Sequence, residues 1–206
     1  MSTICLYGAA SDRIDKEYIK DVEELGKEMA RRGHKMIYGA GSSGLMGAAA
    51  RGMDSKNGHI IGVTPHFMHT FEPIYECTTL INTNTMSERK SIMEQYGEAF
   101  IIVPGGIGTY DEFFQILTLK ELKQTDKPIV IYNVNGYFDK LQELLTDGIQ
   151  KGFIRKVVPE LYYITDNPQK VLDIIESELQ KNKERNDLNQ ENKSSQKHDL
   201  FDDLEK

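Results

Sequence analysis

A glycine-rich stretch near the middle of the chain, residues 104–112, carries the groups needed to hold a phosphate beside a carboxylate. It follows a short apolar run and precedes an apolar pattern with helical spacing, so it joins a strand to the start of a helix. Free backbone N–H groups and the helix dipole attract an anion at such a place. Gly105, Gly106 and Gly108 let the backbone approach that anion without Cβ clashes. Since Glu112 follows within about a turn, the stretch predicts a phosphate site next to a catalytic carboxylate.

The same stretch also fits a structural role, because Thr109 and Glu112 have the spacing of a capping box. In that motif the threonine is the N-cap, and the glutamate accepts a hydrogen bond from the N-cap amide. Thr85 and Glu88 repeat the spacing upstream. Capping does not explain the three glycines, and a capping glutamate keeps one oxygen free. The residues alone therefore leave both roles open for Glu112.

Two consecutive cations, Arg89 and Lys90, fall in the first turn of the predicted helix that Thr85 begins. The helix dipole disfavours positive charge at that end, which indicates an anionic partner, although exposed charges are common on helices. A guanidinium can bind a phosphate or a carboxylate with two hydrogen bonds, so Arg89 is the stronger candidate of the two.

A second glycine-rich turn, residues 39–47, matches the pattern G-x-G-x-x-G of dinucleotide-binding proteins. The strand predicted at residues 59–63 is followed by no acidic residue for a ribose diol, and Leu45 stands where a P-loop requires lysine. We therefore expect this turn to form a wall of a mononucleotide pocket. A dinucleotide site and plain tight-turn glycines are the alternatives.

Strands and helices alternate along the chain, which predicts an α/β fold: a Rossmann-like, doubly wound parallel sheet with helices on both faces. Strands are expected at residues 3–7, 35–38, 59–63, 76–81, 99–103, 128–132 and 161–164. An irregular loop is expected at residues 64–75. Small-residue turns at 8–11, 39–47 and 104–109 each follow a strand. They should therefore meet at the carboxyl edge of the sheet, where such folds bind ligands.

The composition is that of one domain with a tail. The chain has 206 residues, a formal charge of −7 and a pI of about 5.3, which argues against a nucleic-acid-binding surface. We expect a single nucleotide-binding domain over residues 1–180 and a disordered polar tail over residues 181–206. No apolar run reaches the length of a membrane span and no signal-peptide pattern is present, so we expect a cytoplasmic protein.

Metal, thiol and redox chemistry are not predicted. His66 and His69 have the spacing of a ligand pair but no evident third ligand. Cys5 and Cys77 lie in apolar, strand-like contexts, which favours buried structural thiols over a disulfide or a nucleophile. No lysine has a motif context for pyridoxal phosphate, so no cofactor is expected.

Residues 104–112, Pro-Gly-Gly-Ile-Gly-Thr-Tyr-Asp-Glu, together with Met-Ser-Glu-Arg-Lys at 86–90, resemble the LOG family of cytokinin riboside 5′-monophosphate phosphoribohydrolases. Members of that family are often labelled lysine decarboxylases, and the similarity runs over about residues 4–154. The resemblance implies hydrolysis of the N-glycosidic bond of AMP or an N6-modified AMP, giving the free base and ribose 5-phosphate. It implies a homodimer whose subunits both shape each site, no cofactor and no metal, with Arg89 and Glu112 as the catalytic pair.

The resemblance implies that Glu72 and Thr118 contact the substrate and that the second turn, with Gly41, Gly44 and Met46, shapes the nucleotide site. The phosphate site predicted from the residues adds Lys90, Gly105, Gly106, Ile107, Gly108 and Thr109, and the first turn at the same sheet edge adds Gly8 and Ser11. Two positions depart from the family pattern: Ala40 replaces the middle of three glycines, and Ser87 replaces a histidine. The extra methyl group of Ala40 is expected to alter the local shape of the pocket.

Two other classes of function stay open on the sequence. One is a non-catalytic nucleotide-sensing module, which would bind the same phosphate but would not need the Arg89–Glu112 pair. The other is a dinucleotide-dependent oxidoreductase, which the missing ribose acid disfavours. The preferred base is also open, because Phe67, Met68 and Phe71 could cover an isoprenoid-modified adenine or fill the core.

Overall fold

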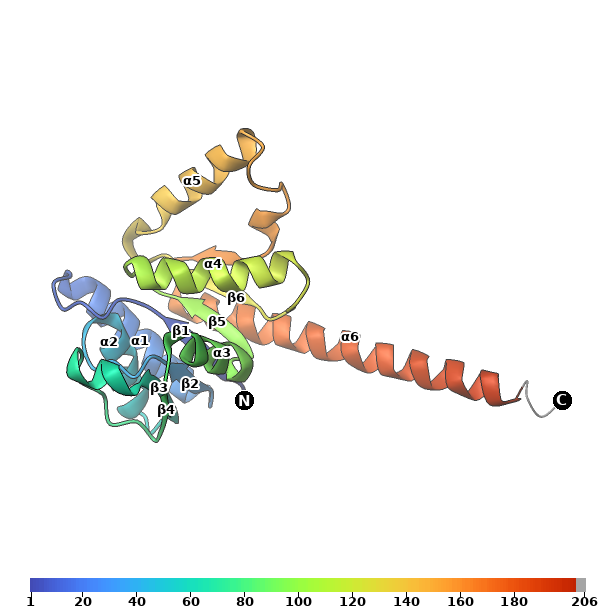
Figure 1. Cartoon of the computed structure of the whole chain (residues 1–206), viewed down its shortest axis with the longest axis horizontal. Helices are drawn as coiled ribbons and strands as arrows, with labels where there is room; N and C mark the ends of the chain where they lie inside the picture. The colour runs from blue at the N-terminus through green and yellow to red at the C-terminus, as the bar shows by residue number, and fades with distance from the viewer. Residues whose placement is uncertain (203–206) are drawn as a thin grey trace.

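The computed structural model describes the backbone of residues 1–202 and the side chains of residues 1–188. Seven parallel strands form one sheet in the order β4-β3-β2-β1-β5-β6-β7 (Figure 1). They are β1 (Thr3–Tyr7), β2 (Lys35–Tyr38), β3 (Ile60–Pro65), β4 (Thr79–Thr83), β5 (Ala99–Ile102), β6 (Ile129–Tyr132) and β7 (Tyr163–Thr165). Each predicted strand is present, and the predicted α/β fold is confirmed. The strand order reverses between β1 and β5, which makes that junction the switch point of the sheet.

Helices cover both faces of the sheet. The buried side chains of α1 (Lys16–Arg31), α2 (Gly44–Asp54) and α6 (Pro168–Asp202) share one hydrophobic cluster with the sheet. Those of α3 (Met86–Tyr96), α4 (Ile107–Glu121) and α5 (Asp139–Gln150) share the other. Short 3-10 helices connect some elements, at η1 (His66–Thr70), η2 (Val134–Gly136) and η3 (Val158–Glu160).

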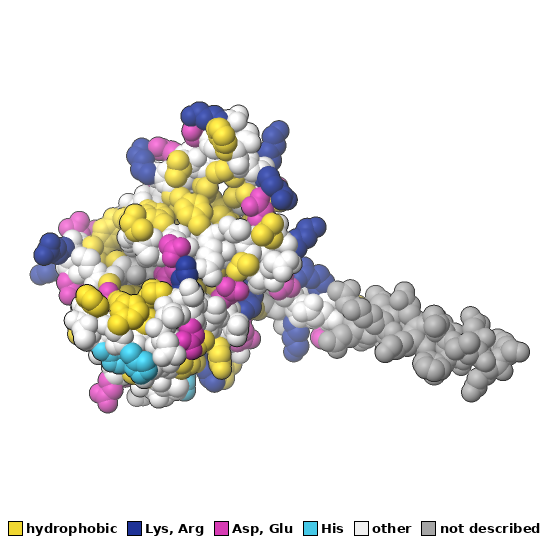
Figure 2. Space-filling model, in the orientation of Figure 1, with side chains coloured by type: hydrophobic (Ala, Val, Ile, Leu, Met, Phe, Trp, Pro, Cys, Tyr) yellow, Lys and Arg dark blue, Asp and Glu magenta, His cyan; other side chains and the backbone are white. Residues whose placement is uncertain are grey.

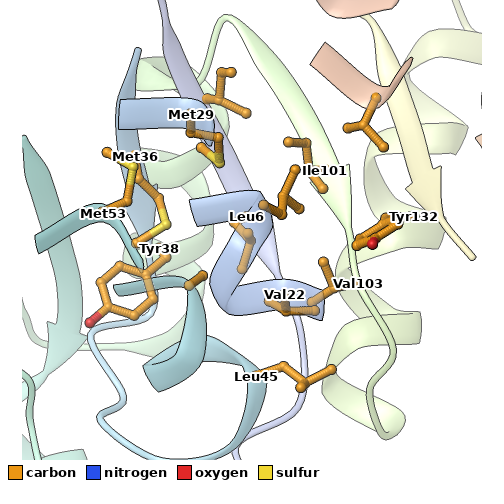
Figure 3. Packing of buried hydrophobic residues seen from close by; sticks show 14 of the residues in the cluster. Leu6, Val22, Met29, Met36, Tyr38, Leu45, Met53, Ile101, Val103 and Tyr132 are labelled. Atoms are coloured by element: carbon orange, nitrogen blue, oxygen red, sulfur yellow. The ribbon is translucent and has the colours of Figure 1, made fainter. Parts of the chain in front are cut away.

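Alternation along β1 shows how the two cores are divided. Ile4 and Leu6 face the first cluster, where Leu6 lies among Val22, Met29 and Tyr38 (Figure 3). Cys5 and Tyr7 point to the opposite face and join the second cluster. Because a central parallel strand is covered on both faces, the four buried residues from Ile4 to Tyr7 form a continuous apolar run rather than alternating with polar ones.

The ends of α1 and α3 show two kinds of capping. Asp15 occupies the N-cap position of α1 without a side-chain hydrogen bond, and Gly33, with φ of +75°, follows the end of this helix in the left-handed conformation that glycine tolerates. At α3 the Glu88 N–H donates to Thr85 Oγ1 at 3.1 Å, as a capping box requires. The Glu88 carboxylate accepts from the Asn84 N–H at 2.8 Å, one residue before the N-cap amide that we expected.

The last helix is longer than the sequence pattern indicated. A disordered tail was expected from residue 181, but α6 continues to Asp202. Hydrogen bonds within the helix (Gln180 to Glu184, 2.7 Å) and from Arg185 to Asp126 (2.5 Å) satisfy the polar residues that follow Leu179. Low apolar content predicted the absence of a core, whereas glutamine, glutamate, lysine and arginine are themselves good helix formers. The end of the predicted tail, residues 203–206, lies outside the described residues.

No helix in the described part of the chain is long and apolar enough to cross a membrane.

Candidate active site

Three loops meet at the carboxyl edge of the sheet, as predicted. The Ala9 N–H, after β1, donates to Pro104 O, after β5, at 3.0 Å. Leu45 N–H and Met46 N–H, at the start of α2, both donate to Ala9 O, at 2.9 and 3.1 Å. The loop after β1 is therefore hydrogen-bonded to both glycine-rich turns. This confirms that turns far apart in the sequence form one surface at the switch point.

The start of α4 offers unpaired backbone donors. The helix begins at Ile107 with Gly106 as its N-cap, and no side chain caps it. The N–H groups of the first turn have no partner within a helix, so they can bind an anion. The alternative in which Thr109 is the N-cap is wrong, because the helix starts two residues before it. Thr109 is instead buried, with Oγ1 only 2.0 Å from where a Cβ on Gly105 would lie, so glycine is needed there.

Gly106 and Gly108 have no such packing requirement. A Cβ built on either residue meets no atom within 4 Å, and neither residue has a positive φ. The protein alone would therefore accept a side chain at both positions. The open space over the first turn of α4 is the kind of space that a bound anion would fill.

Arg89 and Glu112 lie together beneath this surface. Arg89 Nη1 donates to Glu112 Oε1 at 3.3 Å, and Arg89 Nε donates to the carbonyl oxygen of Val63, at the end of β3, at 3.2 Å. Both side chains are largely buried, with 12% and 10% of their surface exposed. A Cβ on Gly39 would lie 2.0 Å from Arg89 Nη2, so the second turn has a glycine where the guanidinium passes.

Burial raises the pKa of Glu112 to about 7, although Arg89 and Lys90 oppose that rise and Asp111 adds to it. Desolvation disfavours the carboxylate more strongly than the two cations favour it. At neutral pH both protonation states are therefore populated. A carboxyl group in this condition can accept or donate a proton during a reaction.

A second ion pair lies beside the first. Lys90 Nζ is 2.8 Å from Asp111 Oδ2, and 21% and 59% of their side-chain surfaces are exposed. Lys90 is thus close to the predicted site, but in this structure its charge is neutralised by a residue that the sequence analysis did not select.

Glu72 and Met46 complete the wall next to Arg89. A Cβ on Gly41 would lie 2.8 Å from Met46 Cε and 3.4 Å from Glu72 Oε2, and Met46 Sδ is 3.3 Å from the same position on Gly39. The structure therefore brings Glu72, Met46 and Gly41 to the side of the site formed by the second turn. Glu72 follows η1, a short helix in the stretch that was expected to be irregular throughout.

The methyl group of Ala40 does not enter this site. Ala40 has φ of +64° and is fully buried. Its Cβ lies 2.8 Å from where a Cβ on Gly62 of β3 would be, so it points toward the neighbouring strand. Our expectation that it alters the local shape of the pocket is therefore wrong for the side occupied by Arg89 and Glu72.

Several predicted residues have other roles or lie elsewhere. Gly44 has φ of +58°, and its N–H donates to Asp12 Oδ1 at 2.7 Å. A Cβ on Gly8 would meet Val103 Cγ2 at 2.3 Å, which makes Gly8 a packing residue. Ser11, Ile107 and Thr118 are exposed: Ser11 Oγ accepts from the Arg13 N–H at 3.1 Å, and Thr118 Oγ1 donates to Phe114 O at 2.7 Å.

Sequence reasoning missed two residues that support the loops. Asp12 caps the second turn through Gly44, and that hydrogen bond, the largest cause, lowers the pKa of Asp12. Tyr137 OH donates to Gly105 O at 2.6 Å from a distant part of the chain. An aspartate just after the first strand is a signal that could have identified Asp12, whereas no local pattern points to Tyr137.

A cavity of about 340 Å³ lies at the switch point, on the α1 side of the first turn of α4. Tyr18 and Tyr137 form an edge-to-face pair there with centroids 6.3 Å apart. The lining residues are Arg13, Ile14, Asp15, Tyr18, Leu45, Pro104, Gly105, Gly106 and Tyr137. Solvent can therefore reach the loop before α4 from this side.

Within the described residues, no three histidine, cysteine or acidic side chains are grouped to hold a metal ion. The rings of His66 and His69 are 6.2 Å apart, and His69 Nε2 is paired with Asn82 Oδ1 at 3.0 Å. Cys5 and Cys77 are both free thiols.

Comparison with known proteins gives consistent matches. A family model described as possible lysine decarboxylase matches residues 46–175. The chain is 36% identical over 171 residues to a cytokinin riboside 5′-monophosphate phosphoribohydrolase of Mycobacterium tuberculosis, covering 82% of this chain and 91% of that protein. It is 34% identical over 155 residues to the rice (Oryza sativa) enzyme of that name, covering 73% of this chain and 63% of the rice protein.

Among solved structures, a Moco carrier protein from Chlamydomonas reinhardtii superposes with a TM-score of 0.65 at 23% identity, covering 87% of this chain and 98% of that one. This likeness concerns the fold.

Proposed function

We propose that this chain, which belongs to the LOG family of phosphoribohydrolases, hydrolyses the N-glycosidic bond of AMP or an N6-modified AMP. The products would be the free base and ribose 5-phosphate. The observation that carries the proposal is the buried Arg89–Glu112 pair beside the uncapped start of α4. In this proposal the Arg89–Glu112 pair acts at the ribosyl carbon, and the start of α4 holds the phosphate.

The start of α4 is the proposed 5′-phosphate site. Its free N–H groups point to the space that Gly106 and Gly108 leave open, and the helix dipole favours negative charge there. Phosphate binding at a distance from the reacting carbon would fix the sugar against Glu112. Binding energy from a part of the substrate that does not react is used in this way to orient the part that does.

Glu112 is the proposed catalytic carboxyl group. Cleavage of the bond between C1′ and the base leaves its electron pair on the base and positive charge on the ribosyl carbon, which a nearby carboxylate stabilises. Water then adds its oxygen to C1′. Glu112, whose pKa of about 7 suits proton transfer at neutral pH, takes a proton from that water, so that C1′ keeps the hydroxyl group. The departing base takes up one proton from solvent, and Glu112 then returns its proton to solvent. Arg89, fixed by Val63 O, orients Glu112.

Release of free base from AMP and from N6-isopentenyl-AMP tests the proposal. Glu112→Gln keeps the size of the side chain and should lower base release about 100-fold or more. Glu121→Gln, at the last turn of the same helix and paired with Arg155 at 3.3 Å, is the matched control and should retain activity. Activity retained by Glu112→Gln would refute the catalytic role. Tight AMP binding without base release by the folded wild type would indicate a sensing module instead.

We also propose a homodimer formed through the exposed face of α4, in a cytoplasmic protein. Ile107, Phe114 and Leu122 are 85%, 37% and 58% exposed and recur at the spacing of one helical stripe, and Thr118 lies on that stripe. Hydrophobic side chains gather over this helix and beneath α5 in Figure 2. Thr118, which is exposed on this stripe, would then contact substrate in the partner's site. Phe114→Glu should yield monomers in sedimentation analysis; an unchanged dimer would exclude this interface.

A further inference from the structure

Two ion pairs join α3 to α4 side by side. Consecutive residues of α3, Arg89 and Lys90, contact consecutive residues of α4, Glu112 and Asp111, in reverse order. The inner pair, Arg89–Glu112, is buried, and the outer pair, Lys90–Asp111, lies at the surface with the shorter separation of 2.8 Å. The mechanism uses the inner pair, whereas the outer pair has no role in it.

The outer pair leaves no unpaired cation next to the inner pair within the described part of the chain. Each of the two cations already contacts a carboxylate, and Glu72 adds a further carboxylate beside Gly41. A ligand with one phosphate can be held by the N–H groups of α4. Each additional phosphate would need a further cation, and Lys90 is already held by Asp111.

We propose that Asp111 is a specificity-determining residue that restricts the site to ligands with one phosphate, by neutralising Lys90 and adding an exposed negative charge close to the start of α4. The proposal rests on the proposed function, since it assumes that a nucleotide binds at this site. Asp111 lies four residues after Ile107, the first residue of α4, and its side chain is 59% exposed, so its charge faces solvent within about one helical turn of the proposed phosphate site. A like charge at that range disfavours a further phosphate even in a partly aqueous environment.

Calorimetric binding of AMP, ADP and ATP, without magnesium, tests the proposal, with every protein carrying Glu112→Gln so that AMP is not consumed. Glu112→Gln alone should bind AMP most tightly of the three. Asp111→Asn keeps the shape of the side chain but removes its charge, so the preference for AMP over ATP should fall roughly fivefold or more. Asp111→Glu, which restores the charge, should retain most of the preference.

A matched control separates a local effect from a change in net charge. Asp147 forms an equally short pair with Lys151 on α5, at 2.8 Å, with both side chains more than half exposed. Asp147→Asn changes the net charge by the same amount and should leave the preference for AMP unchanged. An unaltered preference in Asp111→Asn, or an equal change in Asp147→Asn, would overturn the proposal.

The two proposals fail in different ways. If AMP binds but no base is released, the hydrolase is refuted while the nucleotide preference can still be measured. If AMP does not bind at all, both proposals are refuted. Normal base release with an unchanged preference in Asp111→Asn refutes only the role of Asp111.

Discussion

The two glycine-rich turns use glycine for opposite reasons. In residues 39–47, a Cβ on any of the glycines would meet another part of the protein within 3 Å: Gly39 meets Arg89, Gly41 meets Met46, and Gly44 and Gly47 meet backbone atoms. At the start of α4, Gly105 is also crowded, by Thr109 Oγ1, but Gly106 and Gly108 face open space. The first turn makes room for side chains of the protein itself, and the second leaves room for a molecule that is not protein. Similar motifs in one chain can therefore have different functions.

The strongest way to test the comparison is Gly39→Ala. The new methyl group would overlap Arg89 Nη2, the flexible end of a side chain, so the guanidinium should move away from Glu112 while the fold persists. A displacement of about 1 Å at a catalytic group can cost on the order of 100-fold in rate. We expect base release to fall by about that factor with little change in the melting temperature. Full activity would show that the crowded turn does not position Arg89.

Glu112 is the partner of Arg89, the residue that Gly39 makes room for. The pH dependence of stability tests how strongly Glu112 is desolvated. Its folded-state pKa of about 7 lies above the ordinary value of 4.5, so the folded state binds a proton that the unfolded state has lost. The free energy of unfolding of the wild type should therefore decrease as the pH rises from about 4.5 to 7, by about 3 kcal/mol at most. Glu112→Gln has no carboxyl group to titrate at this position, so its stability should not decrease over this pH range. Chemical denaturation should therefore find it more stable than the wild type at pH 8 and equally stable near pH 4. Parallel curves for the two proteins would contradict the raised pKa.

Gly108→Ala sharpens the comparison from the open turn. The position lies within the first turn of α4 and has free space, so alanine should stabilise the helix by up to about 1 kcal/mol. The same methyl group would occupy the proposed phosphate space and should weaken AMP binding roughly tenfold. The melting temperature should therefore rise while the affinity for AMP, measured by calorimetry, falls. Unchanged AMP affinity would show that the open space is not the phosphate site.

Ala40→Gly should have the smallest effect. Glycine relieves a left-handed conformation that costs alanine about 1–2 kcal/mol. The variant also loses a buried methyl group and gains freedom in the unfolded chain, which offset most of that relief. Stability should change by less than about 1 kcal/mol, with unaltered base release because the methyl group faces β3. A large change in activity would mean that Ala40 shapes the site after all.

The sequence predicted the parts of this structure that depend on short-range pattern. The seven strands, the meeting of the three loops and the proximity of Arg89 to Glu112 followed from periodicity, strand ends and motif resemblance. A capping box that begins at Thr109 was one of the two roles that the sequence left open. In the structure Thr109 packs on Gly105 instead, a tertiary contact that no local pattern contains.

The remaining gaps also involve contacts between distant residues. Tyr137 supports Gly105 across 32 positions, and Lys90 meets Asp111 across 21. Neither partner can be chosen from one sequence, because many exposed tyrosines and aspartates would serve equally well. For α6 the difficulty was of another kind, since a polar composition excludes a core without excluding a helix.

The length of α6 affects how the size of the molecule in solution should be measured. A helix of 35 residues is about 50 Å long at 1.5 Å per residue, and α6 projects well beyond the sheet in Figure 1. Such a projection increases the hydrodynamic radius relative to that of a sphere of equal mass. In gel filtration a monomer of this shape would elute early and could be taken for a dimer. Light scattering or sedimentation equilibrium, which report mass independently of shape, should therefore decide the oligomeric state.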